Sequence, residues 1–316
     1  MLRVVFMGTP AFAVPSLEVI ASGYNIVGVY TQPDRPVGRG LELAFSQVKK
    51  KALELGLPVF QPEKLSAPGE FEKLAALKPD VIVVVAFGQI LRQQVLDLPR
   101  LGCVNVHSSL LPRWRGAAPI QWAILAGDRE TGVTTQKMAL KLDAGEILLQ
   151  ARTPVAPDET ASSLHDRLAV MGSALIAETL SGLITGGIVP RVQDESCVTL
   201  AHKLSKEMER LDPSKPAVEL DRQIRAMNPW PGTSVMAVCG GAAPQRLRVK
   251  KAVLRPEVKG GAGRVFEHAG MVLLSTHEGC LELQRLQWDG KKEVDPSAFL
   301  NGLRGRFKEI DFQVVG

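Results

Sequence analysis

Two polar side chains, two residues apart, begin the densest run of chemically capable residues in the chain. Asn105 and His107 lie at the end of a predicted strand over Cys103–Val106. Because alternate residues of a strand point to the same face, the two side chains should lie side by side on one face of a sheet. An amide donor and an imidazole are groups that polarise a carbonyl and transfer a proton. The pair therefore predicts chemistry at a carbonyl carbon.

A carboxylate farther along the chain is the third candidate. Asp143 stands 36 residues beyond His107, in a turn that also contains Gly145. Folded beside His107, it would orient the imidazole or balance its charge. No cluster of metal ligands accompanies these residues, so we expect no metal and direct acyl transfer. The residues alone leave a structural role open, because strand-end histidines and Asp-x-Gly turns are common without catalysis.

Several cofactor and nucleophile motifs are missing from the sequence. The first predicted strand is followed by Gly8-Thr9-Pro10, which lacks the further glycines that a dinucleotide needs for close approach. The sequence also has no GxxxxGK[ST] phosphate loop and no GxSxG nucleophile elbow. A nicotinamide enzyme and a serine hydrolase are therefore disfavoured.

Short β-rich runs alternate with helical stretches through the first half of the chain. Val81–Val85 is apolar on both faces, as is typical of a central parallel strand covered by helices on each side. We therefore expect an α/β fold with a doubly wound, mostly parallel sheet. In such sheets ligands bind beyond the carboxyl ends of the strands, so the loops after Phe6, Tyr30, Val85 and Val106 should carry the site.

The pattern changes in the last third of the chain. Five short strands follow the Pro/Gly-rich stretch Asn228–Gly232, which we expect to be a seam between domains. Their number and length predict a small all-β, OB-like barrel. We expect a catalytic domain over 1–190, a linker over 191–207 and the barrel domain over 208–316. The five strands are Ser234–Val238, Arg246–Leu254, Gly263–Phe266, Met271–Ser275 and Cys280–Leu286.

The positive charge of the chain is concentrated in that last third. Residues 1–202 contain 19 basic and 19 acidic side chains, so the remaining 19 basic and 14 acidic residues carry the whole net charge of +5. Arg246, Arg248 and Lys250 alternate on one strand and should share a face at intervals of about 7 Å. Such a row suits a phosphate backbone, although a solvated edge strand also uses charge to avoid aggregation.

The spacing of the cysteines and the first residues of the chain indicate the cellular compartment in which the protein is expected. The four cysteines are scattered, without a CxxC pair, which suits a reducing compartment rather than a disulfide framework. Met1–Phe6 enters a strand-like run directly, and the apolar runs are too short to span a bilayer. We expect a cytoplasmic protein with no membrane partner, acting as a monomer.

The run from Asn105 to Pro119 resembles the signature of folate-dependent formyltransferases, Asn-x-His-x-Ser-Leu-Leu-Pro followed later by Leu-Asp-x-Gly. The longer run Ser109–Gln121 resembles the branch of this family that acts on methionine carried by initiator tRNA. Other segments with the same resemblance are Gly8–Pro10, Thr31–Pro36, Gly38–Gly40, Phe87–Leu91, Asn228–Gly232, Gly290–Lys292 and Phe299–Gly302.

This resemblance implies transfer of a formyl group from 10-formyltetrahydrofolate to the amino group of methionine on initiator tRNA, as a step of translation initiation. It implies that Asn105, His107 and Asp143 are catalytic. A family member that formylates a small amine, a nucleotide sugar or glycinamide ribonucleotide, is the nearest alternative. A third is an RNA-binding protein with an inactive enzyme domain, which the intact trio disfavours.

The resemblance also implies which residues bind the two substrates. Ser109, Leu110, Leu111 and Pro112 would line the folate site, and Val85, Ala86, Phe87 and Gly88 would give main-chain contacts to the pteridine. Arg35 and Arg39 lie in a loop that contacts the tRNA acceptor end in the family, and Arg246, Arg248 and Lys250 would bind tRNA from the barrel. This chain departs from the family over Leu41–Gln47, which is less cationic and more apolar.

Overall fold

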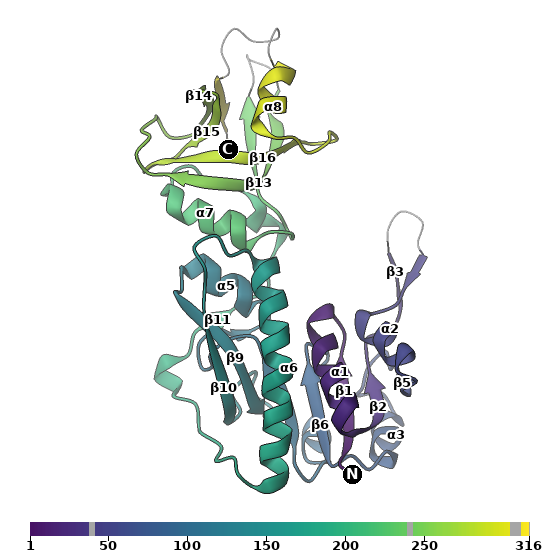
Figure 1. The fold of residues 1–316 in the computed structure, drawn as a ribbon. Helices are drawn as coiled ribbons and strands as arrows, with labels where there is room; N and C mark the ends of the chain where they lie inside the picture. Colours follow the sequence, from purple (N-terminus) through teal and green to yellow (C-terminus); the bar gives the residue numbers. More distant parts are fainter. Residues whose placement is uncertain (38–41, 239–242, 304–310, 316) are drawn as a thin grey trace. The chain divides into compact units, whose positions relative to one another are not determined.

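The computed structural model describes residues 1–316 except 38–41, 239–242, 304–310 and 316. The chain divides into two compact units, each described by itself below (Figure 1). The first unit comprises Met1–Pro119, Glu130–Pro154 and Leu164–His202. The second unit comprises Ile120–Arg129, Val155–Ser163 and Lys203–Gly316.

A seven-stranded sheet forms the centre of the first unit. The five strands from β7 to β5 in spatial order are parallel, and β9 and β10 extend the sheet as antiparallel strands at one edge. The predicted mostly parallel α/β sheet is therefore confirmed. The order is β10 (Ile147–Pro154), β9 (Glu130–Lys137), β7 (Cys103–His107), β6 (Val81–Val85), β1 (Arg3–Gly8), β2 (Asn25–Tyr30) and β5 (Val59–Phe60).

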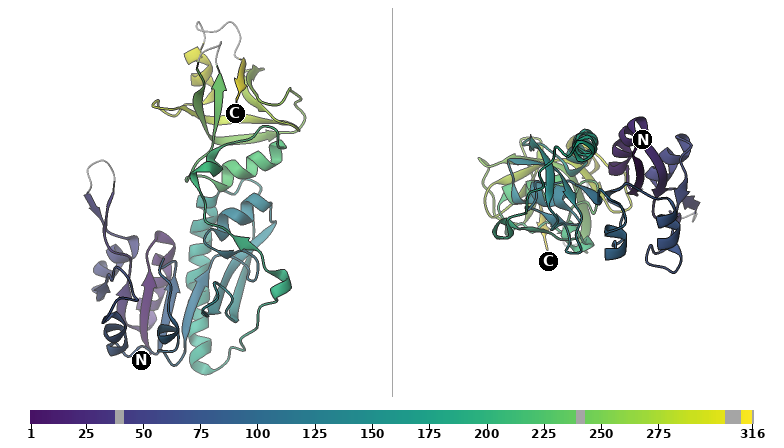
Figure 2. Two further views of the ribbon diagram at one scale, coloured as in Figure 1. Left: turned by 180° about the vertical axis from the view of Figure 1, so that it is seen from behind. Right: turned by 90° about the horizontal axis from the view of Figure 1, so that it is seen from below.

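Helices lie on both faces of this sheet, as the front and reverse views show (Figures 1 and 2). One face contributes Val5, Ile82 and Cys103 to a core cluster with Leu74 of α3 and Val95 of α4. All five residues of β6 are buried, as expected of a strand covered on each side. The helices of this unit are α1 (Val14–Gly23), α2 (Gln47–Glu54), α3 (Glu70–Ala76), α4 (Gln93–Leu96) and most of α6 (Ala161–Thr185), with the 3-10 turns η1 (Ala11–Ala13) and η2 (Glu195–Cys197).

The helix α6 packs on the face opposite that core cluster. A side chain at Gly172 would lie 3.0 Å from Val106, so the small residue permits close contact with β7. Thr179 Oγ1 lies 2.8 Å from Thr135 Oγ1 on β9. In the described part of the chain α6 is the one helix with the length and hydropathy of a membrane span, but its buried side chains serve the core of the unit.

The residues that we predicted to be the start of a linker fold onto the first unit. Arg191 exchanges backbone hydrogen bonds with Ile147 of β10. Farther along, β11 (Leu200–Ala201) pairs with β8 (Arg115–Gly116) directly after the candidate catalytic strand. Residues 191–202 are therefore an integral part of the first unit, and we refer to them as the returning segment.

A closed antiparallel barrel forms the centre of the second unit, which confirms the predicted all-β fold. The five predicted strands are present, and a sixth, β17, closes the barrel by pairing with β12 and β14. The strand β17 was not predicted, because its four residues have one buried side chain and show no clear alternation. The order is β12 (Ser234–Val238), β13 (Gln245–Arg255), β16 (Cys280–Trp288), β15 (Met271–Ser275), β14 (Arg264–His268) and β17 (Asp311–Val314).

Two helices contribute to the barrel core. Leu220 and Ile224 of α7 and Phe299 of α8 are buried in the same cluster as the inward residues of the strands. The stretch Asn228–Gly232, which we expected at a domain seam, lies inside this unit and connects α7 to β12. The remaining elements are α5 (Pro119–Ala126), α7 (Ala217–Ala226), α8 (Pro296–Leu303), the 3-10 turn η3 (Lys206–Glu209) and the hairpin strands β3 (Arg35–Val37) and β4 (Glu42–Ala44) of the first unit.

Candidate active site

The strand β7 places Asn105 and His107 on one face at its carboxyl end, as predicted. Asn105 is half-buried and lies opposite Gln136 of β9, and His107 is buried and lies opposite Thr134. Within the part of the chain that the structure describes, the Asn105 amide has no hydrogen-bond partner. An amide of this kind has a donor free for a ligand.

The imidazole of His107 is oriented from both sides. Its Nε2 lies 2.9 Å from the carbonyl oxygen of Trp114, and its Nδ1 lies 3.8 Å from Oδ1 of Asp143. Since a carbonyl oxygen only accepts, Nε2 carries a hydrogen and Nδ1 is the nitrogen that faces the carboxylate. A positive charge on the ring would be stabilised by Asp143 at this distance. The structure therefore brings the predicted His107 and Asp143 together.

The carboxylate of Asp143 is held by two donors. The backbone N–H of Gly116 donates to Oδ2 at 2.9 Å, and the side-chain amide of Gln136 donates to Oδ1 at 3.1 Å. Asp143 has a left-handed backbone conformation, with φ of 49°. A side chain at Gly145 would lie 1.6 Å from the carbonyl oxygen of Lys137, so this turn requires glycine for close approach. Gln136 links Asn105, its cross-strand neighbour, to Asp143.

The returning segment holds the backbone that orients these side chains. Thr199 accepts from the Trp114 N–H through its hydroxyl at 2.9 Å and from the Arg115 N–H through its carbonyl at 2.9 Å. Gly116 has φ of 124°, and a side chain there would lie 2.5 Å from the carbonyl oxygen of Ala201. The carbonyl that accepts from His107 and the N–H that donates to Asp143 are therefore both fixed by this segment.

A buried arginine connects the returning segment to the site. Arg115 is 2% exposed and donates to Gln193 at 3.0 Å and to Glu195 at 2.8 Å. Hydrogen bonds from Arg115 and then Lys141 lower the pKa of Glu195 to about 2. No periodic pattern pointed to Gln193, because this residue lies in an irregular segment.

The loop over Ser109–Pro112 is closed by its own hydrogen bonds. The hydroxyl of Ser109 donates to the carbonyl of Arg113 at 2.6 Å, and Thr134 Oγ1 accepts from the N–H of Leu111 at 3.1 Å. Ser109 and Leu111 are buried, whereas Leu110 and Pro112 are half-buried, and the Leu111–Pro112 peptide bond is cis. Leu110 and Pro112 are therefore the more accessible members of the predicted folate loop.

Three loops meet beyond the carboxyl ends of the parallel strands. The carbonyl of Phe87 accepts from Thr9 Oγ1 at 3.0 Å and from Gln32 Nε2 at 3.1 Å. Phe87 is buried, while Ala86 and Gly88 are exposed and have positive φ. The predicted segment Val85–Gly88 therefore presents backbone polar groups at the edge where ligands bind in this fold.

Arg35, one of the predicted cations of the first unit, is the first residue of β3. Arg35 is largely exposed and pairs with Glu63 at 2.7 Å, and Arg39 lies outside the described residues. At the base of the hairpin Asp34 pairs with Lys49 and accepts from Gln61 at 2.9 Å. These contacts, the hydrogen bond from Lys49 above all, lower the pKa of Asp34.

The predicted cations of the barrel share the outer face of β13, since the intervening Leu247 and Val249 are buried. Each cation is paired with a carboxylate. Arg248 lies 2.9 Å from Asp289, Lys250 lies 2.9 Å from Glu293, and Arg246 lies 3.2 Å from Glu209. We call Arg246, Arg248 and Lys250 the β13 row.

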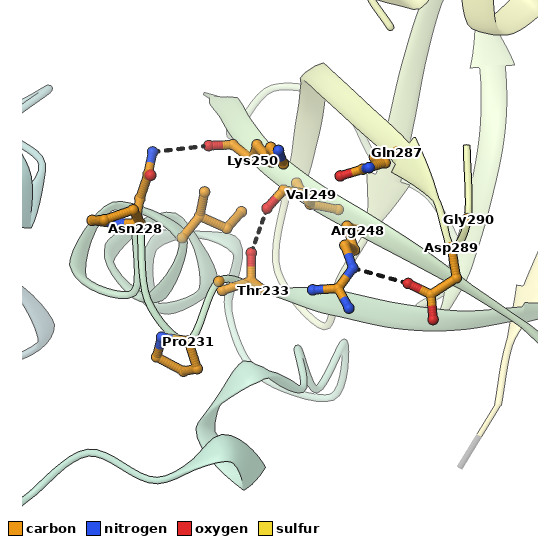
Figure 3. Close-up of a pocket in the computed structure, with 12 residues that line it drawn as sticks. Asn228, Pro231, Thr233, Arg248, Val249, Lys250, Gln287, Asp289 and Gly290 are labelled. Atoms are coloured by element: carbon orange, nitrogen blue, oxygen red, sulfur yellow. Dashed lines mark hydrogen bonds and ion pairs between the residues drawn. The ribbon is translucent and has the colours of Figure 1, made fainter. Parts of the chain in front are cut away.

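A pocket of about 460 Å³ lies beside this row in the second unit (Figure 3). Asn228 donates to the carbonyl of Lys250 and Thr233 donates to the carbonyl of Val249, so the chain after α7 is fixed against β13. Arg248 and Asp289 stand on the other side of the pocket, joined by their ion pair (Figure 3). The pocket thus has a polar wall with both signs of charge.

Two family descriptions match the chain. "Formyl transferase" matches residues 2–180, and "Formyl transferase, C-terminal domain" matches residues 203–304. An α/β domain with an amide, an imidazole and a carboxylate at the sheet edge, followed by a barrel, agrees with these matches. The chain belongs to the formyltransferase family.

Relatives that match along nearly their whole length show to which branch of the formyltransferase family the chain belongs. Methionyl-tRNA formyltransferase of Pseudomonas paraeruginosa is 48% identical over 97% of this chain and 97% of its own length. The enzyme of the same name from Halorhodospira halophila is 48% identical over 96% of each chain. Within its family the chain therefore belongs to the methionyl-tRNA formyltransferases, enzymes that transfer a formyl group in translation initiation.

Solved structures with low identity share the fold. An N-formyltransferase from Helicobacter canadensis, in complex with folinic acid and dTDP-3-aminofucose, is 19% identical, with a TM-score of 0.67 over 90% of this chain and 99% of that chain. HypX from Aquifex aeolicus is 19% identical, with a TM-score of 0.63 over 96% of this chain. This chain spans about half of HypX, 49% of its length.

Proposed function

We propose that the formyl donor is 10-formyltetrahydrofolate and that the acceptor is the amino group of methionine on initiator tRNA. The contact between His107 and Asp143 at 3.8 Å, beside Asn105 on the same strand face, is the observation that carries this proposal. The proposal is supported by folate relatives of the same fold and by the names of the full-length relatives.

In the proposed reaction the amine nitrogen attacks the formyl carbon and forms a tetrahedral oxyanion. The amide of Asn105 would donate to this oxyanion, and a positive charge on the His107 ring would stabilise it. A preorganised donor contributes about 3–4 kcal/mol in comparable sites. Asp143 would take the proton from the attacking nitrogen, directly or through water, and would stabilise a positive charge on His107. The bond from the carbon to the folate nitrogen then breaks, and that nitrogen takes up the proton that Asp143 accepted, directly or through water.

We propose two surfaces for the folate. Ser109, Leu110, Leu111 and Pro112 form the side wall, where the hydrogen bond from Ser109 to Arg113 keeps the loop in place. Val85, Ala86, Phe87 and Gly88 provide backbone groups for the pteridine, which is supported by the exposure of Ala86 and Gly88.

We propose that the tRNA contacts the enzyme through Arg35 and Arg39 in the first unit and through the β13 row in the second. Arg35 is exposed at the hairpin, and a phosphate would replace Glu63 as its partner. On β13 the phosphates would compete with Asp289 and Glu293 in the same way. We further propose a cytoplasmic enzyme, because initiator tRNA is formylated where translation begins, and a monomer.

The test is an assay of the purified protein with 10-formyltetrahydrofolate and three acceptors. We expect rapid formylation of methionyl initiator tRNA, slow formylation of methionyl elongator tRNA and none of a free amino sugar. Preference for the amino sugar would reject the proposed acceptor in favour of a small amine. Elution as a dimer in size-exclusion chromatography would reject the proposed monomer.

A further inference from the structure

We propose that Gln193 is a positioning residue, which sets the place of Asp143 relative to His107; this inference rests on the proposed function. Gln193 stands in the returning segment, outside every strand of the sheet, yet it is 5% exposed. Among the described residues, its side-chain hydrogen bonds go to none of the three predicted catalytic side chains. Its effect on the reaction would pass through the Asp143 turn.

All hydrogen-bonding groups of the Gln193 amide are engaged. Its nitrogen donates to the carbonyl of Asp143 at 2.8 Å and to the carbonyl of Gly145 at 2.7 Å. Its oxygen accepts from Nε of Arg115 at 3.0 Å. The same nitrogen lies 3.3 Å from Oε1 of Gln136, whose own amide donates to Asp143. Gln193 therefore binds two carbonyls of the Asp143 turn, and Gln136 binds the carboxylate of Asp143.

A glutamine suits this position because its partners are of opposite kinds. The two carbonyls only accept, and the guanidinium of Arg115 only donates. A primary amide offers two donors and an acceptor from one side chain, whereas a carboxylate has no donor for the carbonyls and an ammonium has no acceptor for Arg115. Replacement by an apolar side chain would leave buried polar groups without partners.

The backbone of Asp143 depends on external support. With φ of 49° it occupies a left-handed conformation that a non-glycine residue adopts at a cost. The two bonds from Gln193 and the donors Gly116 and Gln136 hold it there. Loss of the Gln193 bonds would let the carboxylate shift, and a displacement of about 1 Å in a catalytic geometry costs on the order of 100-fold in rate.

Glu195, two residues farther along, provides a matched comparison in the same segment. It also binds Arg115, and it reaches the turn through Lys141 at 2.6 Å, but its side chain is 60% exposed. Exposed ion pairs contribute little, since water screens them. Variants of the two residues can therefore be compared. An effect found only at Gln193 would show that the buried amide positions the turn, whereas an equal effect at Glu195 would show that the segment contributes to stability in general.

The experiment compares Gln193→Leu, Gln193→Glu, Glu195→Gln and Asp143→Ala in the full chain, with kcat and KM for both substrates and the Tm. Gln193→Glu keeps the acceptor for Arg115 and removes both donors to the turn. We expect kcat to fall about 10- to 100-fold in both Gln193 variants, with KM close to wild type. We expect Glu195→Gln to retain wild-type kcat.

Hydrogen exchange gives a readout that does not depend on activity. The N–H of Gly116 is bonded to Asp143 Oδ2, so it should exchange faster in both Gln193 variants and not in Glu195→Gln. A wild-type kcat in Gln193→Glu, a change confined to KM, or unfolding of both Gln193 variants would overturn the positioning role. If Asp143→Ala loses activity while the Gln193 variants keep it, only this inference fails. If the wild type does not formylate methionyl-tRNA, the proposed function fails with it.

Discussion

The carboxyl edge of β7 and the outer face of β13 both align polar and charged side chains, but they differ in burial. At β7 the side chains of His107 and Asp143 are about nine-tenths buried, and Gln193 and Arg115 behind them are buried as well. On β13 the cations are about one-third to one-half exposed, and each pairs with at least one carboxylate. Buried networks position groups, because each unmet bond is costly, whereas exposed pairs exchange partners easily.

The largest effect should come from the trio itself. In His107→Ala and Asn105→Ala we expect kcat to fall by about 100- to 1,000-fold. The first variant removes the ring whose positive charge would stabilise the developing oxyanion, and the second removes an amide donor to it. Affinity for methionyl-tRNA, measured by filter binding, should stay close to wild type. An equal loss of binding would mean that this edge of the sheet is a binding surface and not the reaction centre.

The next largest effect should come from the packing of the buried turn that contains Asp143 and Gly145. Gly145→Ala places a methyl group against the carbonyl of Lys137, where the approach is 1.6 Å, so the turn must move. We expect a loss of about 1–3 kcal/mol in the free energy of unfolding together with a large fall in kcat. The measurements are urea unfolding and the formylation assay.

Gly23→Ala is the matched control, because a methyl group there would meet nothing within 4 Å. It should leave activity unchanged and stability unchanged or slightly higher. If Gly145→Ala had the stability and kcat of the wild type, the Asp143 turn would tolerate displacement. The difference between this buried turn and the exposed outer face of β13 would then be smaller than we infer.

Substitutions in the exposed β13 row should have smaller effects on tRNA binding, and these effects should depend on salt. Arg248→Ala should weaken tRNA binding and reduce the slope of log K against log salt by about one. Asp289→Asn should strengthen binding, because it frees Arg248 and Arg246 from a shared partner. Arg255→Ala, at the far end of the same strand and paired with Glu282, serves as the control. Equal effects of Arg248→Ala and Arg255→Ala would remove the special role of the β13 row.

The smallest effect concerns acid stability. Pairing with Arg115 and Lys141 lowers the pKa of Glu195 from 4.5 to about 2, so the pair stabilises the fold fully above pH 4.5. That contribution is lost as the pH falls through the folded pKa. Glu195→Gln should therefore be slightly less stable than wild type at pH 7, and this difference should shrink as the pH falls from 4.5 toward 2. Denaturant unfolding at several pH values measures this, and a difference of the same size at pH 7 and pH 2 would contradict it.

The sequence by itself determined the features that depend on local periodicity. Alternation placed Asn105 and His107 on one strand face and Arg246, Arg248 and Lys250 on another, and the apolar run Val81–Val85 identified a central strand. The motif resemblance pointed to the family, which the matches to both domains confirm. These features follow from patterns that repeat within a few residues.

Only the tertiary structure decided which distant groups meet. Gln193 lies 50 residues beyond Asp143, in a segment without periodicity that we had predicted to be a linker, and its contacts depend on the path of the whole returning segment. In the same way, the carboxylates that pair with the β13 row come from the loop after β16 and from η3. Side-chain partners far apart in sequence are set by how strands and segments pack, and a local pattern carries no record of that packing.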